Sequence, residues 1–208
     1  MTDRFDRPLD VPRRPWQRRI EVFSPKLRRR LTLFSPSAQQ AWLLLEAEPA
    51  VKTFCERPAF LKGDSGRVID FWVDRGRRAE FWLLDAAHAK AGETEEPAAY
   101  PPRILGLALR VVRREELLAH AVRIQNWARI VPYLVCSGHA PDPRLQRDVL
   151  ARLAKPHQLQ ALEKAFAPVD LTALRSAIFS LLAAGKAISP DLERAPLGYT
   201  TRFRQAAR

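Results

Sequence analysis

Residues 67–84 of the chain read RVIDFWVDRGRRAEFWLL, and this stretch decides the fold of the first half. Two runs rich in aliphatic and aromatic residues, 67–73 and 79–84, flank the turn sequence Asp74-Arg75-Gly76. Residues of this kind favour strands, and glycine admits the backbone of a tight turn. We therefore predict two neighbouring strands, with Asp70 at a strand end and Glu80 on the strand that follows.

The flanking sequence extends this pair into a mixed sheet. Further strands are predicted at residues 17–23, 30–34, 60–62 and 104–112, with a hairpin turn at residues 63–66. Between the early strands, Ser35-Pro36 opens a helix that ends before Pro49, since serine is a favoured N-cap and proline suits the first helical position. The first half is therefore predicted to be an α/β (or α+β) domain.

The second half of the chain has a helical pattern. Residues 144–154, 157–166 and 171–184 are three helical runs, and the third follows the capping residue Asp170. Residues 186–189 and 198–204 indicate two short strands. Three helices followed by a hairpin are typical of a winged helix-turn-helix, in which the third helix reads DNA and residues 191–196 form the tip of the wing. A generic helical subdomain is the alternative.

The chain is strongly basic. Its 208 residues carry 35 lysines and arginines against 23 acidic residues, which gives a net charge of +12. Arginine predominates and binds phosphate through two hydrogen bonds, so nucleic acid is the expected partner. A biased genome would explain arginine over lysine but not the excess of cations. Residues 1–16, with three prolines, indicate a basic extended arm, either a solvated tail or a segment that tracks phosphates.

Several classes of protein are disfavoured by what the sequence lacks. No apolar run is long enough to span a bilayer and the N-terminus has no secretory pattern, so we expect a cytoplasmic protein without a membrane partner. Neither a GxxxxGK[ST] loop, a GxGxxG loop nor a GxSxG elbow is present. Cys55 and Cys136 lie far apart, without zinc-ligand spacing, and are expected to be reduced thiols.

Asp70 also suggests a specific chemistry. Metal-dependent nucleases of the PD-(D/E)xK type place an aspartate at a strand end, and a Glu (or Gln) and a Lys two residues apart on the next strand. The period of two puts both side chains on one face with the aspartate, where the carboxylates hold Mg²⁺ and the lysine contacts the attacking water or the phosphate. Asp70 and the strand at residues 79–84 have this order.

Three phrases in a fixed order add to this comparison: LLLEAEPAV at residues 43–51, FCERP at residues 54–58, and Asp70-Phe71. Together they resemble the TnsA family, the endonuclease subunits of heteromeric cut-and-paste transposases. The resemblance implies a restriction-endonuclease-like domain at residues 17–136 and a winged-helix domain at 142–208. It also implies two Mg²⁺ ions, cleavage of the non-transferred strand at transposon ends, a DDE transposase subunit and an AAA ATPase regulator as partners, and association with a bacterial nucleoid.

The sequence departs from this family at its catalytic positions. The family's first glutamate falls on Ala38, and its strand pair falls on Trp82 and Leu84. These side chains neither ligate Mg²⁺ nor activate water, so we expect no metal and no cofactor. Trp82 either packs in the core or fills the former metal pocket. A rescued site would take Mg²⁺ and would consist of Asp70, Glu80 and Lys90.

The residues expected to face DNA come from both halves of the chain. They are Arg28, Arg29, Arg30, Arg77, Arg78, Thr172, Arg175, Arg202 and Arg204. Each arginine alone is open to the simpler interpretation of a solvated surface residue, but the set favours a DNA-facing surface. The leading hypothesis is a TnsA-like protein that binds double-stranded transposon-end DNA and partner subunits without cutting. The alternatives are an active Mg²⁺-dependent endonuclease that uses Asp70 and Glu80, and a basic adaptor for an acidic protein.

Overall fold

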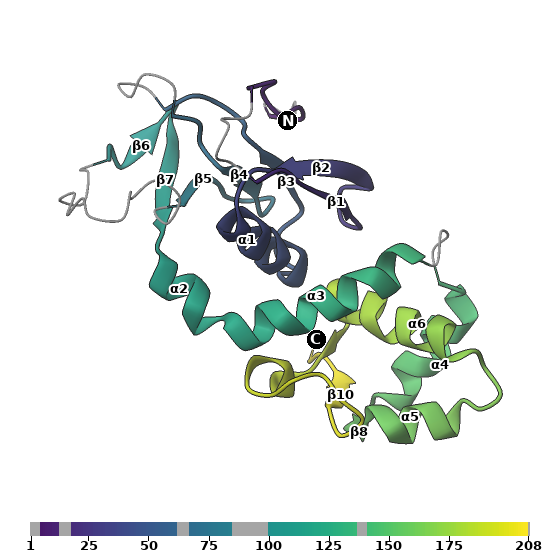
Figure 1. Cartoon of the computed structure of the whole chain (residues 1–208). Helices are drawn as coiled ribbons and strands as arrows, with labels where there is room; N and C mark the ends of the chain where they lie inside the picture. The colour runs from purple at the N-terminus through teal and green to yellow at the C-terminus, as the bar shows by residue number, and fades with distance from the viewer. Residues whose placement is uncertain (1–4, 13–17, 62–66, 85–99, 137–140, 208) are drawn as a thin grey trace. The chain divides into compact units, whose positions relative to one another are not determined.

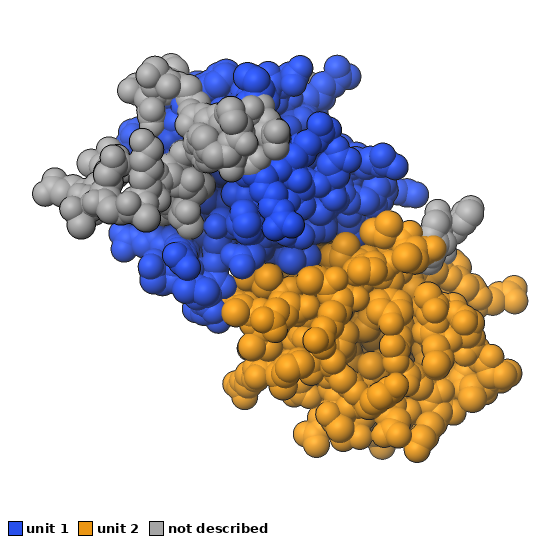
Figure 2. Space-filling view, viewed as in Figure 1, with its two compact units in different colours: residues 1–45, 50–119 blue, residues 46–49, 120–208 orange. Residues whose placement is uncertain are grey.

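The chain forms two compact units (Figures 1 and 2). The computed structural model describes residues 5–12, 18–61, 67–84, 100–136 and 141–207. One unit contains Met1–Leu45 and Ala50–Ala119, and the other contains Glu46–Pro49 and His120–Arg208. The second unit thus begins earlier than the domain start predicted at residue 142. In the part of the chain that is described, no helix is both long and apolar enough to cross a bilayer.

The first unit is built on a mixed sheet. Its elements are β1 (Ile20–Ser24), β2 (Arg29–Leu33), α1 (Pro36–Ala47), β3 (Thr53–Glu56), β4 (Phe71–Asp74), β5 (Ala79–Leu84), β6 (Arg103–Ile104), β7 (Leu107–Val112) and α2 (Arg114–Ala119). β1 and β2 pair as a separate antiparallel hairpin, and the other strands follow the order β3-β4-β5-β7-β6 (Figure 1). β5 and β7 are parallel, and the remaining neighbours are antiparallel. The predicted mixed α/β character is confirmed.

The hairpin of β4 and β5 is formed by the stretch at residues 67–84. Its register pairs Phe71 with Trp82, and the predicted strand 79–84 has the bounds of β5. Gly76 at the turn has a φ of +83°, a conformation that glycine adopts without steric cost. The predicted strand 104–112 is instead split into β6 and β7 at Leu105 and Gly106, which both have positive φ. The turn predicted at residues 63–66 lies outside the described residues.

Local capping positions α1 as the sequence predicted. The Ser35 hydroxyl accepts a hydrogen bond from the Ala38 amide at 3.0 Å, and Pro36 is the first helical residue. The apolar residues Ala41, Trp42 and Leu45 of this helix are buried. The helix start predicted at Ser35-Pro36 is therefore confirmed.

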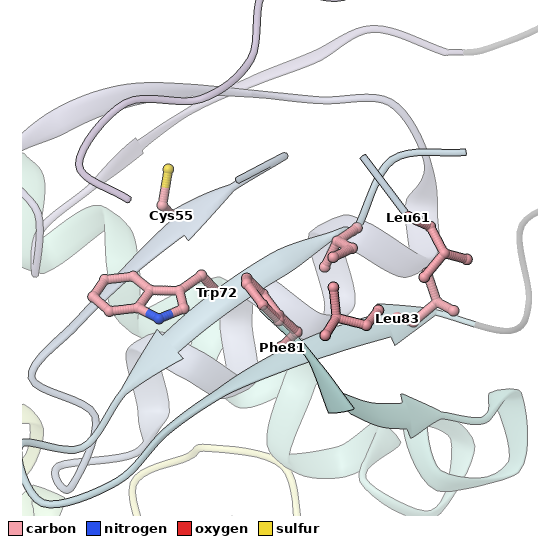
Figure 3. Packing of buried hydrophobic residues seen from close by; sticks show 7 residues of the cluster. Cys55, Leu61, Trp72, Phe81 and Leu83 are labelled. Atoms are coloured by element: carbon pink, nitrogen blue, oxygen red, sulfur yellow. The ribbon is translucent and has the colours of Figure 1, made fainter. Parts of the chain in front are cut away.

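One hydrophobic cluster joins the strands of the mixed sheet, and the N-terminal segment packs on it. The cluster consists of Cys55, Leu61, Ile69, Trp72, Phe81, Leu83 and Ile104 (Figure 3). The Phe5 ring centroid lies 5.7 Å from that of Trp72 and 5.2 Å from that of Phe81. Leu9 donates its amide to the Arg57 carbonyl at 2.9 Å. Phe5 and Leu9 thus hold this segment against the first unit, because burial of an aromatic ring is favourable, whereas Asp6, Arg7 and Asp10 stay exposed. Residues 1–4 and 13–16 lie outside the described part.

The second unit is mainly helical. Its elements are α3 (Ala121–Cys136), α4 (Pro143–Arg152), β8 (His157–Gln158), α5 (Leu159–Ala165), α6 (Leu171–Ala183), β9 (Ala187–Ile188), η2 (Pro190–Glu193) and β10 (Arg202–Gln205). The strands form an antiparallel sheet in the order β8-β10-β9. The helix predicted at 157–166 is therefore shorter in the structure, because residues 157 and 158 pair with β10 as a strand before α5 begins.

Helix α6 lies at the centre of this unit. It packs against both α3 and α4, and the Asp170 carboxylate caps it by accepting the Ala173 amide at 2.9 Å. Most of its residues are buried, namely Leu174, Ser176, Ala177, Ile178, Phe179, Leu181 and Leu182. The packing of α3 on α6 explains why α3 belongs to this unit rather than to the first.

Candidate functional site

The carboxylate predicted to be catalytic, Asp70, lies immediately before β4. Its Oδ2 accepts the Leu84 amide at 2.8 Å, and its own amide donates to the Trp82 carbonyl at 3.1 Å. Burial raises the pKa of the Asp70 carboxyl to about 7, against the hydrogen bond from Leu84 and the positive charge of Arg67, which both lower it. At neutral pH this group is therefore divided between its protonated and ionised forms.

Glu80, the second carboxylate of the predicted pair, lies at the other end of the hairpin. The register places it opposite Val73, three residues along β4 from Asp70, which corresponds to about 10 Å of strand. Its Oε1 accepts the Trp82 indole N–H at 2.9 Å and the Arg75 guanidinium at 2.7 Å, and Arg78 lies 3.6 Å from Oε2. The structure does not bring Asp70 and Glu80 together.

The charge state of Glu80 follows from these partners. Burial acts to raise the pKa of its carboxyl, but the hydrogen bonds from Trp82 and Arg75 and the nearby positive charge lower it below the usual value. Glu80 is thus ionised, and its carboxylate is held by Trp82, Arg75 and Arg78. As a ligand for Mg²⁺ it would first have to release these donors, so the prediction of a joint Asp70–Glu80 metal site is wrong. Lys90, its suggested partner, lies outside the described residues.

The positions where the TnsA-like family carries its other catalytic groups are apolar and buried. Ala38 and Leu84 are core residues, and Trp82 is 5% exposed. The guanidinium carbons of Arg110 and Arg75 lie 4.8 and 5.8 Å from the Trp82 ring centroid. Trp82 is thus a packed residue flanked by cations. Among the described residues, no three His, Cys, Asp or Glu side chains gather where they would hold a metal ion.

The arginines predicted to contact DNA in the first unit differ in their exposure and in their partners. Arg29 makes a bidentate ion pair with Glu56, at 2.9 and 2.6 Å, and Glu56 is 2% exposed. Arg29 is therefore held by a buried carboxylate that needs its charge and is not a freely solvated turn residue. Arg28 and Arg30 are exposed.

The other predicted pair in this unit lies at the turn between β4 and β5. Arg77 and Arg78 are both exposed, and the Arg78 side chain is 72% exposed despite its 3.6 Å contact with Glu80. Such an exposed ion pair contributes little, so Arg78 stays available to a phosphate.

The predicted recognition helix has a different role. Arg175 of α6 donates from Nε to Glu163 at 2.7 Å and from Nη1 to the Tyr133 hydroxyl at 2.9 Å. These partners on α5 and α3 hold the guanidinium, so in this structure Arg175 joins three helices rather than extending freely into solvent. Thr172 is exposed, between the uncharged residues Leu171 and Ala173. The exposed first turn of α6 therefore carries no cation.

The backbone of the predicted wing tip, residues 191–196, is held by α3, although residues 193–196 are exposed. It contains the 3₁₀ helix η2, and the buried Asn126 of α3 holds the chain that follows it. The Asn126 amide nitrogen donates to the carbonyls of Leu192 and Ala195 at 2.9 and 2.8 Å, and its oxygen accepts the Leu197 amide at 2.7 Å. A buried amide with all these bonds satisfied fixes this segment against α3.

Arg202 and Arg204 lie on β10, where both are exposed. Phe203 between them is fully buried, as the strand period of two requires. Three further exposed cations lie beside this strand and were not predicted: Arg152, Lys155 and Lys186. The alternation Arg-Phe-Arg was visible in the sequence, whereas nothing local indicated that these three residues flank it.

No protein-family model and no curated protein sequence matches this chain. The resemblance to the TnsA family therefore depends on the quoted phrases alone.

Proposed function

We propose that this protein binds double-stranded DNA without cutting it, as a TnsA-like component of a transposition complex. The observation that carries the proposal is the state of the nuclease-type centre. Asp70 has no carboxylate partner at the nuclease positions, since Glu80 is bound by Arg75 and Trp82 at the far end of the hairpin. A single carboxylate does not hold a catalytic Mg²⁺ ion, which takes several oxygen ligands.

The arrangement of elements supports the fold expected from the resemblance. A helix precedes three antiparallel strands, and the third pairs with a parallel strand, which is compatible with a restriction-endonuclease-like sheet. In the second unit, α4, β8, α5, α6, β9 and β10 follow one another, and β10 lies between the other two strands. This order supports a winged-helix interpretation.

The charge supports DNA as the ligand. A net charge of +12 creates a long-range attraction for a polyanion, and exposed arginines occur on both units. The expected partners remain transposon-end DNA, a DDE transposase subunit and an AAA ATPase regulator, in the cytoplasm at the nucleoid. No Mg²⁺ is needed for this role.

The test is a nicking assay on supercoiled DNA with Mg²⁺ or Mn²⁺, with gel retardation of the DNA in the same samples. We expect retardation without nicking, unchanged in Asp70→Ala. Nicking that Asp70→Ala abolishes would refute the non-cutting role and support the alternative of an active nuclease. Absence of retardation at 50 mM salt would refute DNA binding and favour the adaptor for an acidic protein.

The alternative of an active enzyme has one observation in its favour. Asp70 keeps a carboxyl whose pKa is raised to about 7, and perturbed carboxyls concentrate at functional sites. A partner subunit that supplies the missing carboxylate would complete the site. Nicking that appears only when the DDE transposase subunit is added, and disappears in Asp70→Ala, would establish this alternative.

A further inference from the structure

The sheet of the second unit carries a cluster of exposed cations around its central strand. We name it the β10 basic surface, and it consists of Arg152, Lys155, Lys186, Arg202 and Arg204. We propose that this surface, rather than helix α6, contacts the phosphate backbone of duplex DNA. The proposal rests on the proposed function and names the surface that performs it.

The backbone of β10 brings these residues together from distant parts of the chain. The Gln205 amide donates to the Leu153 carbonyl at 2.7 Å, which places the end of α4 beside the strand. The Ala206 amide donates to the Lys186 carbonyl at 2.9 Å on its other side. Arg152 and Lys155 therefore flank the strand on one side and Lys186 on the other.

The two arginines of β10 have the geometry of a phosphate-contacting pair. Arg202 and Arg204 are two residues apart, so their side chains leave the same face with Cα atoms about 7 Å apart. Opposite them in the register are the uncharged residues Gln158 and Ile188. Each guanidinium is thus able to take one phosphate through two parallel hydrogen bonds.

Among the residues that the structure describes, the acidic side chains beside the strand form no ion pair with these cations. Asp191 accepts the backbone amide of Arg202 at 2.9 Å, and Glu193 pairs with Arg123 at 3.3 Å. Within the described residues, no ion pair involves any of the five cations of the β10 basic surface.

The surface suits a duplex better than a single strand. Proteins that bind single strands stack successive bases on several aromatic side chains. In the described part of the second unit, Tyr199 is the exposed aromatic residue, and it lies outside the strands. Arginine and lysine contacts to phosphates position a duplex without reading its sequence, so we expect salt-sensitive binding with little sequence preference.

The experiment compares two double variants of the full chain by fluorescence anisotropy with a 30-bp DNA duplex over a range of salt concentrations. Arg202→Gln/Arg204→Gln removes the central pair. The matched control is Arg144→Gln/Arg147→Gln, which removes two exposed arginines near the N-terminal end of α4, the end remote from Leu153. Thermal unfolding of both variants verifies that they fold, which is expected because all four side chains are exposed.

We expect the first variant to bind about 30-fold more weakly at 0.15 M salt, with the slope of log Kd against log salt reduced by about 2. The control should bind like the unmodified chain. Suppose that the unmodified chain binds DNA and that neither variant differs from it, or that both variants bind more weakly to the same extent. Either result would refute the assignment of DNA binding to the β10 basic surface but not DNA binding itself. If the unmodified chain does not bind the duplex at 50 mM salt, the proposed function itself is refuted. Equal or tighter binding of a single strand or of an RNA duplex would overturn the assignment to duplex DNA.

Discussion

Replacing Asp70 by asparagine is expected to stabilise the protein at neutral and alkaline pH and to have little effect below about pH 4. Asparagine has the same shape, and its oxygen is able to accept the Leu84 amide as the carboxylate does. It cannot ionise, so it avoids the cost of a desolvated charge.

The sign and size of the effect follow from the pKa of Asp70. Its rise from 3.8 to about 7 means that, between these pH values, the folded protein holds a proton that the unfolded chain has lost. The free energy of unfolding therefore falls as pH rises through this window and stays level above it. Roughly three pH units at about 1.4 kcal/mol each set an upper bound of about 4 kcal/mol. Because Asp70 as a whole residue is only half-buried, we expect the free energy of unfolding to fall by about 2 kcal/mol across this window.

The assay is urea denaturation of the original chain and of Asp70→Asn at pH 4.5, 6 and 8. The stability gain of the variant should grow from about a quarter of its full value at pH 4.5 to its full value at pH 8. Asp142→Asn is the control, since it replaces an exposed helix cap by an equally good cap and should show no such growth. A gain that is the same at all three pH values, or that is larger at pH 4.5, would show that burial of the Asp70 charge has been misjudged.

Three other substitutions test the packing inside the two units, each measured by chemical denaturation. Asn126→Ala is expected to cost about 3 kcal/mol, because three backbone groups lose their partner in a buried site; a cost under about 1 kcal/mol would mean that water replaces the amide. Arg29→Ala leaves the buried Glu56 unpaired and should cost about 3 kcal/mol, whereas DNA affinity should fall no more than the loss of one charge requires. Gly185→Ala should destabilise by 1 kcal/mol or more, since φ is +69° and the new Cβ would lie 2.9 Å from Pro49; an unchanged midpoint would contradict that close approach.

Features that depend on near neighbours in the chain were predictable from the sequence. Ser35 and Asp170 cap their helices through amides three residues away, and β5 has the bounds that its aliphatic and aromatic run predicts. The alternation of Arg202, Phe203 and Arg204 likewise predicts which side chains leave the strand toward solvent. These features need no knowledge of the rest of the molecule, because capping and alternation act over a few residues.

The partners of charged residues were not predictable in this way. Arg29 lies in an arginine run that suggests a solvated surface, yet its carboxylate partner Glu56 is 27 residues away. Arg175 is polar on a helix with an apolar pattern, yet Glu163 and Tyr133 engage it from two other helices. Pairings of this kind depend on distances between segments far apart in the chain, and the sequence alone does not contain those distances.

The same distinction applies to the nuclease-type centre and to the β10 basic surface. Composition and net charge indicated a basic, phosphate-binding protein, but strand register decides that Asp70 and Glu80 lie at opposite ends of a hairpin. Backbone hydrogen bonds at Gln205 and Ala206 decide that Lys186 and the end of α4 flank β10. Net charge and the alternation of side chains along a strand are properties of the chain itself. The grouping of distant side chains into a site arises only when sheet pairing and helix packing bring their segments together.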